Sequence, residues 1–358
     1  TGVQTCALPI FDKKVPQVKF VDRTFNCRHD HAMAIWTYIH EHDNGITNFH
    51  FEVSADLLNE KEIALINRMR PGLIQLEIGV QSANEITIRE INRTMKIDVL
   101  STIVDKIKKG NNVHQHLDLI AGLPYEGYES FGKSFDRVYK MNPEQLQLGF
   151  LKVLKGSVMH DRAQEYGIVY QDRAPYEVLS TKWLTYAEVI RLKQIEEMVE
   201  VYYNSGQFCC TMAALEQEFA SPFCMYECLA AYYDEKNAFA VSHSRIGRYE
   251  ILYDFIVKTC KERSEQYMEM LTLDMYLRDN VKKRPEFLRE SGVSSDEAAA
   301  FYKKEEKERT YLKAYEGYDR RQMRKMTHLE RIDGKTVLFD YKNRDPLTGN
   351  AAIYYLSE

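Results

Sequence analysis

Polar residues at the ends of apolar runs are the part of this sequence best suited to chemistry. One run, residues 76–82, ends in Gly-Val-Gln-Ser, and another, residues 118–124, begins with aspartate and ends in Gly-Leu-Pro. The polar residues at or near strand ends are Asp22, Glu52, Glu77, Gln81, Ser82 and Asp118, with Arg93 on a following segment. In a barrel of parallel strands such residues meet at the C-terminal rim, where ligands bind. Their spacing suggests a nucleoside-type ligand held by backbone and a few polar groups.

Alternating strand and helix patterns would position these residues. From residue 16 onward the apolar pattern predicts five strands, at residues 18–22, 48–53, 73–80, 114–120 and 146–154. Helical patterns of about 10–15 residues separate them, which indicates right-handed βαβ units and a parallel sheet. We therefore expect an α/β protein with a partial (β/α) barrel or a doubly wound sheet, and the strand order does not follow from the pattern alone.

The second half of the sequence has a different character. Its long helical patterns lie at residues 184–203, 222–235, 244–262, 265–280 and 294–315. Ser294 and Glu297 form a capping box at the start of the last of these. A β tail follows, at residues 327–332, 336–341 and 351–356. We divide the chain into residues 1–10, a partial barrel at 11–175, a helical domain at 176–325 and a C-terminal β segment at 326–358.

Composition limits the classes of partner. The 358 residues are 44% apolar, which is ample for a core, and their net charge of −5 does not favour nucleic acid or an anionic membrane. No apolar run approaches the roughly 20 residues that cross a bilayer. Seven cysteines, an odd number in a long chain, argue against a disulfide scaffold. We expect a cytoplasmic protein that acts on a small molecule or another, unknown substrate.

The order of the polar motifs resembles that of radical S-adenosylmethionine (SAM) enzymes. The matching residues are Glu52, Gly-Val-Gln-Ser at 79–82, Asn92-Arg93 and Asp-Leu-Ile-Ala-Gly-Leu-Pro at 118–124. Residues 21–26 resemble the second strand of the family's cobalamin-binding branch, and the helical remainder resembles a C-terminal domain of unknown function found there. The resemblance covers about residues 15–160. It implies a TIM-like barrel lacking its first strand, followed by a mostly α-helical domain with a C-terminal β-hairpin.

The resemblance also implies how SAM would be held. The residues that would contact it are Glu52, Gln81, Ser82, Arg93, Asp118, Gly122 and Leu123. Glu52 and Asp118 would hold its amino or ribose groups, and Arg93 would pair with its methionine carboxylate. Gln81 and Ser82 would hydrogen-bond the same ligand. The backbone of the Gly-Leu pair would approach the adenine, because glycine has no Cβ to obstruct it.

The cysteines depart from the family pattern. A radical SAM enzyme holds a [4Fe–4S] cluster on three cysteines, usually spaced CxxxCxxC, because thiolates are the required ligands. Cys224 and Cys228 supply CxxxC, but position 231 is alanine and the pair lies in a helical pattern, so we expect it to pack in the core. We expect Cys209 and Cys210 to be a buried pair. The sequence therefore predicts no metal ligand and no catalytic residue in this chain.

The first ten residues suggest a reason for that departure. They show no strand or helix period, they lack a start methionine, and when back-translated they resemble a sequencing-library adapter. We expect residues 1–10, including Cys6, to be an artefact fused to a truncated reading frame. The cluster loop and any cobalamin domain would lie upstream of Phe11. On this hypothesis the parent is a radical SAM enzyme served by a reductant protein, and this fragment is inactive.

Two other functions fit the same residues. One is a non-radical (β/α) barrel enzyme in which Glu52 and Asp118 transfer protons. The other is a non-catalytic module that binds SAM or a nucleoside, with the helical region docking a partner. The helical region identifies no substrate pocket: the polar stretch at residues 274–279 is expected to be a solvated helix face with a tyrosine in the core.

Overall fold

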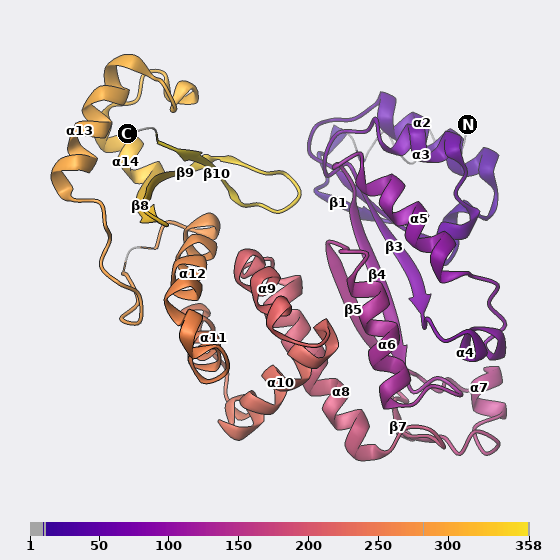
Figure 1. Cartoon of the computed structure of the whole chain (residues 1–358). Helices are drawn as coiled ribbons and strands as arrows, with labels where there is room; N and C mark the ends of the chain where they lie inside the picture. Colours follow the sequence, from indigo (N-terminus) through magenta and orange to yellow (C-terminus); the bar gives the residue numbers. More distant parts are fainter. Residues whose placement is uncertain (1–9, 11, 282, 357–358) are drawn as a thin grey trace. The chain divides into compact units, whose positions relative to one another are not determined.

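The computed structural model describes residue 10 and residues 12–281 and 283–356 (Figure 1). The described chain forms two compact units, and the first comprises the residues up to Asn204 together with Ser221–Ala230. The first unit therefore extends beyond the division at residue 175 that the sequence suggested. Cys6 and most of the proposed adapter segment lie outside the described residues, so that hypothesis stays a prediction.

A parallel five-stranded sheet forms the centre of the first unit. Its strands are β1 (Gln17–Lys19), β2 (Asn48–Val53), β3 (Ile74–Gln81), β4 (His114–Ala121) and β5 (Gln145–Phe150). They are arranged in sequence order, β1-β2-β3-β4-β5, and every neighbouring pair is parallel. All five carboxyl ends therefore lie along one edge. The α/β class and the parallel sheet are confirmed, and the strand order left open by the sequence is that of a barrel segment.

Two predicted strands are shorter than expected. β1 ends at Lys19 instead of residue 22, and β5 ends at Phe150 instead of residue 154. Beyond β5 the backbone turns to another partner, because Val153 N donates to Tyr176 O at 2.8 Å and Lys152 pairs antiparallel with Glu177. The apolar residues that suggested a strand continue to residue 154, but after Phe150 the backbone pairs with residues 176–177 instead of β4.

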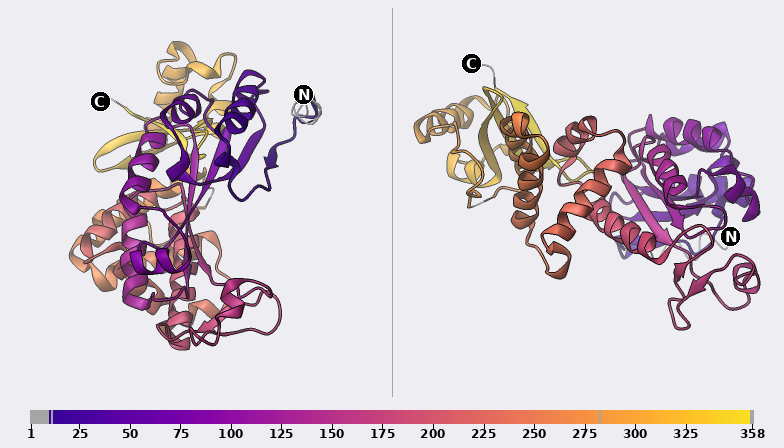
Figure 2. Two further views of the ribbon diagram at one scale, coloured as in Figure 1. Left: turned by 90° about the vertical axis from the view of Figure 1, so that its right-hand side faces the viewer. Right: turned by 60° about the horizontal axis from the view of Figure 1, so that its bottom comes forward.

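Most helices of the first unit lie along the outside of the curved sheet, whereas α4 (Glu85–Glu90) and α7 (Val158–Asp161) lie near the carboxyl end of β3 (Figures 1 and 2). The other helices are α2 (His29–Glu41), α3 (Glu60–Ile66), α5 (Ile97–Lys108), α6 (Tyr128–Tyr139), α8 (Tyr186–Val199) and the first part of α10 (Pro222–Glu235), with the β6 (Val169–Tyr170)–β7 (Val178–Ser180) hairpin between α7 and α8. Right-handed crossovers between sequential strands bring the helices to the same face. In β3 every second residue, from Ile74 to Val80, is buried. Glu77, Gly79 and Gln81 alternate with them and are half-buried, so the other face is polar.

Asn204 covers part of the outer edge of β5. It is the last residue of a π-helical turn, Glu200–Asn204, that continues α8. Its Oδ1 accepts from Leu146 N at 2.9 Å, and its Nδ2 donates to Leu146 O at 2.9 Å. One side chain thus makes both of the hydrogen bonds that a neighbouring strand would make to this residue.

The second unit is helical with a small antiparallel sheet. Its helices are α9 (Cys209–Leu215), the end of α10, α11 (Arg245–Thr259), α12 (Ser264–Arg278), α13 (Ser295–Glu308) and α14 (Arg320–Met326). Its strands are β8 (Thr327–Ile332), β9 (Lys335–Arg344) and β10 (Ala351–Tyr355), in the order β10-β9-β8. Both halves of the predicted capping box are formed at Ser294 and Glu297. None of the described helices combines the length and apolarity needed to cross a membrane.

Helix α13 ends earlier than the sequence suggested. It stops at Glu308 instead of residue 315, because Arg309 adopts a left-handed conformation with a φ of 51°. The buried Glu305 carboxylate then accepts from the backbone N–H groups of Tyr311 and Leu312, at 3.1 and 2.9 Å. A charged side chain of the helix thus stabilises the turn that ends it.

Candidate functional site

A cavity of about 670 Å³ lies at the carboxyl ends of the parallel strands. Four of the residues expected to contact SAM line it: Glu52, Gln81, Arg93 and Asp118. Lys19, Glu77 and Gly79 also face it. Ligand pockets usually have volumes of about 300–1,000 Å³, so the cavity is large enough for a nucleoside-sized molecule.

Asp118 sits among hydrogen-bond donors from β3. Its Oδ1 accepts from Val80 N at 3.1 Å, and its Oδ2 accepts from Gln81 Nε2 at 2.9 Å. Burial raises the pKa of this carboxyl to about 6, although the Val80 N–H and the charge of Arg93 favour the ionised form. Near pH 7 the site therefore holds a carboxylate that is easily protonated in mild acid.

Gln81 reaches Asp118 because β3 ends in a bulge. The register with β4 shifts between Gly79, which faces Asp118, and Gln81, which faces Leu119. Gln81 itself has a φ of 69°, in the left-handed region that side chains rarely adopt. Bulges of this kind redirect side chains next to functional sites. At the bulge the Gln81 side chain lines the cavity together with Glu77 and Gly79.

The turn after α4 brings Arg93 back to the sheet. Asn92 has a φ of 55°, and Arg93 N donates to Ile88 O at 2.9 Å, an arrangement common at helix C-termini. Arg93 Nη1 then donates to Gly79 O at 2.7 Å. A Cβ on Gly79 would lie 2.8 Å from Gln81 Nε2 and 3.3 Å from Arg93 Nη1, so a side chain here would displace these two polar groups. A guanidinium has five N–H donors, and this contact leaves others for a ligand.

Ser82 is not brought to the cavity. It is fully buried, and its hydroxyl donates to Glu126 Oε1 at 2.7 Å. The same carboxylate oxygen accepts from Ser134 Oγ at 2.7 Å. Desolvation raises the pKa of Glu126, and the two serine hydroxyls partly offset that effect. Ser82 thus joins the end of β3 to the loop after β4.

Gly122 and Leu123 also lie away from the residues that line the cavity. Leu123 is 4% exposed and packs in an apolar cluster with Tyr166 and Val178. Gly122 has a φ of 90°, and a Cβ there would lie 2.7 Å from Val178 Cγ1. Glycine is therefore required at residue 122 because of the positive φ and because Val178 leaves no room for a Cβ. A contact between this residue and adenine is supported only by the resemblance to radical SAM enzymes.

We expect Gly122→Ala to destabilise the chain by about 2 kcal/mol, because it combines backbone strain with a close contact to Val178. Gly156→Ala is the matched control, since Gly156 has a φ of 81° but a Cβ there would have no other atom within 4 Å. Gly156→Ala should lower the free energy of unfolding by only about 1 kcal/mol, because only the backbone conformation is strained. Urea unfolding followed by circular dichroism measures both. Equal losses would mean that Val178 moves aside without cost.

A charged cluster on the polar face was not singled out from the sequence. Glu77 Oε2 lies 3.1 Å from Lys19 Nζ and 2.9 Å from His50 Nε2. Burial alone would raise the pKa of Glu77, but Lys19 and the nearby histidines lower it. Burial lowers the pKa of both His50 and His116, and for His50 the Lys19 charge adds to the effect. The alternation of His, Glu and Asp along β2, β3 and β4 is the sequence feature that could have indicated this cluster.

Comparison with known proteins assigns the second half of the chain. A family model described as "Protein of unknown function (DUF4080)" matches residues 164–346, just over half of the sequence. The chain belongs to the DUF4080 family. The resemblance of the helical remainder to a domain of unknown function is thereby confirmed. In this DUF4080 protein the matched range begins after β5, so the family model does not cover the strands that line the cavity.

Curated relatives match a shorter stretch of the DUF4080 protein. The oxygen-independent coproporphyrinogen III oxidase of Salmonella typhimurium is 29% identical over 107 residues, covering 28% of this chain and 23% of the relative. The oxygen-independent coproporphyrinogen-III oxidase-like protein HemZ of Bacillus subtilis is 28% identical over 119 residues, covering 32% and 22%. The chain thus spans about a quarter of the length of these curated relatives.

Solved structures with a similar arrangement include two radical SAM proteins. The radical SAM methyltransferase TsrM from Kitasatospora setae, solved with cobalamin and a [4Fe–4S] cluster, has a TM-score of 0.40 and 11% identity and covers 49% of this DUF4080 chain and 36% of that chain. Coproporphyrinogen III oxidase (HemN) from Escherichia coli, described as a radical SAM enzyme, has a TM-score of 0.32 and 17% identity, covering 40% and 36%.

Proposed function

We propose that the rim cavity binds SAM and that this chain carries the SAM-binding part of a radical SAM enzyme. The observation that carries the proposal is the convergence of Asp118, Gln81 and Arg93 around Gly79, with Glu52 lining the same cavity. SAM is a zwitterionic nucleoside, so it requires both anionic and cationic partners. The similarity to the coproporphyrinogen III oxidases supports the same function.

Each of the four side chains has a role in this proposal. The Arg93 guanidinium pairs with the methionine carboxylate, a charge-assisted contact that arginine can make with two parallel hydrogen bonds. Glu52 and Asp118 accept hydrogen bonds from the ammonium or the ribose hydroxyls. Gln81 holds the Asp118 carboxylate in place through its amide and lines the cavity itself.

A [4Fe–4S] cluster does not fit the residues of this cavity. Such clusters are held by cysteine thiolates, and the described residues that line the cavity include none. The sequence also contains no CxxxCxxC motif. In our proposal the cluster ligands, any cobalamin and the electrons from a reductant protein come from outside these 358 residues. In this proposal the residues of this chain bind SAM and do not themselves generate a radical.

Titration calorimetry with SAM tests the proposal directly. We expect the wild-type chain to bind SAM and Arg93→Ala to bind it about tenfold more weakly, because a partly solvated charge-assisted contact is lost. Arg89→Ala is the matched control: Arg89 lies on α4, just before the turn that carries Arg93, its side chain is 78% exposed, and it pairs with Glu85 instead of facing the cavity. Absence of SAM binding to the wild-type chain, or equal losses in both variants, would contradict the proposal.

The raised pKa of Asp118 favours a second candidate function. A carboxyl that titrates at about 6 is suited to general acid–base catalysis near neutral pH, and Glu52 lines the same cavity. In that case the chain is a proton-transfer enzyme that does not need SAM. The same titration separates the two functions, because the proton-transfer enzyme shows no Arg93-dependent affinity for SAM.

A further inference from the structure

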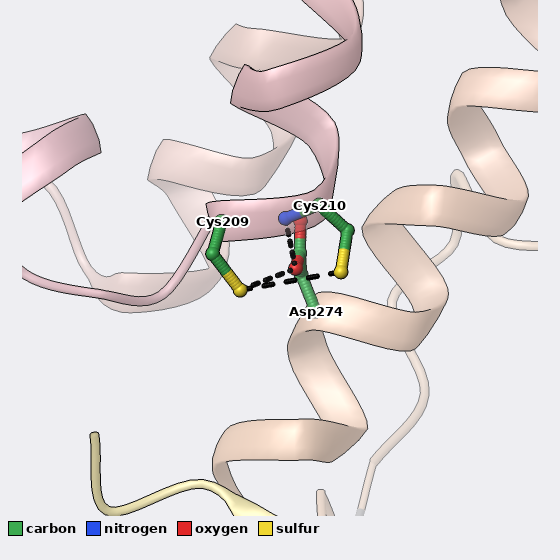
Figure 3. A group of neighbouring side chains, drawn as sticks. All are labelled: Cys209, Cys210 and Asp274. Carbon is green, nitrogen blue, oxygen red and sulfur yellow. Dashed lines mark hydrogen bonds between the residues drawn. The ribbon is translucent and has the colours of Figure 1, made fainter. Parts of the chain in front are cut away.

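A second cluster of reactive side chains lies in the other compact unit (Figure 3). Cys209 and Cys210 begin α9, and Asp274 lies on α12. Figure 3 shows the two thiols and the carboxylate pointing toward one another. The Cys209 and Cys210 sulfurs are 4.0 Å apart, and Cys209 Sγ lies 3.4 Å from Asp274 Oδ1. All three ligand atoms lie within 4.8 Å of one another.

Neither the cysteines nor the aspartate are where the sequence suggested. Cys209 is exposed and Cys210 is half-buried, so the expectation of a buried pair was wrong. Asp274 is 1% exposed and not on a solvated helix face. Its carboxylate accepts from Cys210 N at 2.9 Å and from Thr211 N at 2.8 Å. The aspartate therefore joins two segments more than 60 residues apart, a contact that no local pattern indicates.

Two of the three ligand separations are close to those of a tetrahedral metal centre. Zinc binds thiolate sulfur at about 2.3 Å and carboxylate oxygen at about 2.0 Å, so tetrahedral geometry sets two sulfurs about 3.8 Å apart and a sulfur and an oxygen about 3.5 Å apart. The observed separations are 4.0 and 3.4 Å. A disulfide would need about 2.05 Å between the sulfurs, so this is a pair of free thiols.

We propose that Cys209, Cys210 and Asp274 bind one thiophilic divalent cation of the Zn²⁺ class. Thiolates and a carboxylate are a suitable donor set for this ion, and three protein ligands leave the fourth position for water or another small ligand. Asp274 keeps lone pairs for the metal beyond the two backbone N–H groups it accepts. Helix capping alone explains the carboxylate but not the two thiols beside it.

Thr211 provides the outer partner that metal ligands usually have. It is fully buried, its backbone N–H donates to Asp274 Oδ2 at 2.8 Å, and its hydroxyl has no hydrogen-bond partner among the described residues. Outer hydrogen bonds of this kind hold ligating carboxylates in position. The proposed site thus has three ligands, and the Thr211 backbone N–H holds one of them in position.

Cobalt substitution tests the site in the full chain. We expect reduced, metal-free protein to bind one Co²⁺ and to show the intense absorption of thiolate-to-cobalt charge transfer. Added Zn²⁺ should displace the Co²⁺ and abolish this absorption. Cys209→Ser and Asp274→Asn should lose this absorption. Cys260→Ser is the matched control, since it removes a half-buried cysteine of the same unit at the end of α11. Retention of the absorption in Cys209→Ser, or its loss in Cys260→Ser, would overturn the proposal.

Alkylation of the wild-type chain gives a readout that does not depend on variants. Cys209 and Cys27 are both exposed, so both should react with iodoacetamide in the metal-free protein. We expect Zn²⁺ to protect Cys209 and Cys210 and to leave Cys27 reactive, as measured by peptide mass spectrometry. Equal labelling of Cys209 with and without zinc would overturn the proposal. Failure of SAM binding would leave this result unaffected, because the two sites share no residue.

Discussion

Asp118→Asn should bind SAM about 100-fold more weakly than the wild type at about pH 8, because a hydrogen bond to a buried charge is lost. The asparagine keeps an oxygen that can accept from Val80 N, so the end of β3 should be retained. Titration calorimetry measures the affinity. Asp98→Asn is the matched control, since the Asp98 side chain is 89% exposed and pairs with Arg137 on the surface. Undiminished SAM affinity in Asp118→Asn would exclude a direct role for the carboxylate.

The pH dependence provides a second, independent measure of Asp118. Its pKa is raised to about 6, and the ligand needs the ionised form, so SAM affinity should be constant above pH 6 and fall as the carboxyl is protonated. Below that value the loss should approach about tenfold per pH unit. The SAM affinity of Asp118→Asn should be low and independent of pH over the same range. The two curves should converge near pH 4, and a flat wild-type profile would contradict the assignment.

Arg284→Met should destabilise the second unit by about 3 kcal/mol, because it leaves a buried carboxylate without its cation. Glu330 is 1% exposed, and its Oε2 lies 2.5 Å from Arg284 Nη1 and 3.2 Å from His328 Nε2. Hydrogen exchange of peptides from β8 and β9 measures this loss of stability. These peptides should exchange about 100-fold faster in the variant than in the wild type. Arg289→Met is the matched control, since its pair with Glu265 is solvent-exposed and should contribute less than about 1 kcal/mol.

The effect of Arg284→Met should depend on pH. Burial raises the pKa of Glu330, but the hydrogen bonds and charges of His328 and Arg284 lower it below its usual value overall. A carboxyl with a lowered pKa stabilises the fold above its unfolded-state pKa, and this contribution is lost as the pH falls through the folded-state pKa. The difference between wild type and variant should therefore be full at neutral pH and shrink in acid. A difference independent of pH would mean that Glu330 is not the partner that matters.

The sequence was sufficient for those site residues whose position depends on regular strands. Glu52 and Asp118 lie on parallel strands of one sheet near their carboxyl ends, and parallel topology alone brings such residues to one edge. Gln81 is the last residue of β3, and the turn after α4 returns Arg93 to the end of the same strand. Local pattern and topology agree for these four residues, and the structure brings all four to one cavity.

The residues that the structure does not bring to the cavity depend on contacts between distant segments. Ser82 is one residue beyond Gln81, but its hydroxyl hydrogen-bonds Glu126, 44 residues away. Leu123 is buried by Tyr166 and other residues that follow β5. One step along an extended chain reverses the side-chain direction, and a bulge changes that alternation again, so local pattern cannot say which side chain faces the ligand.

Asn204 has a consequence for the behaviour of the protein in concentrated solution. An uncovered strand at the edge of a sheet presents free N–H and C=O groups that can pair with another chain and start aggregation. Because the Asn204 amide occupies both backbone groups of Leu146, this stretch of β5 is closed to an incoming strand. A single side chain therefore supplies a protection against self-association that other proteins obtain from an additional strand or from charged edge residues.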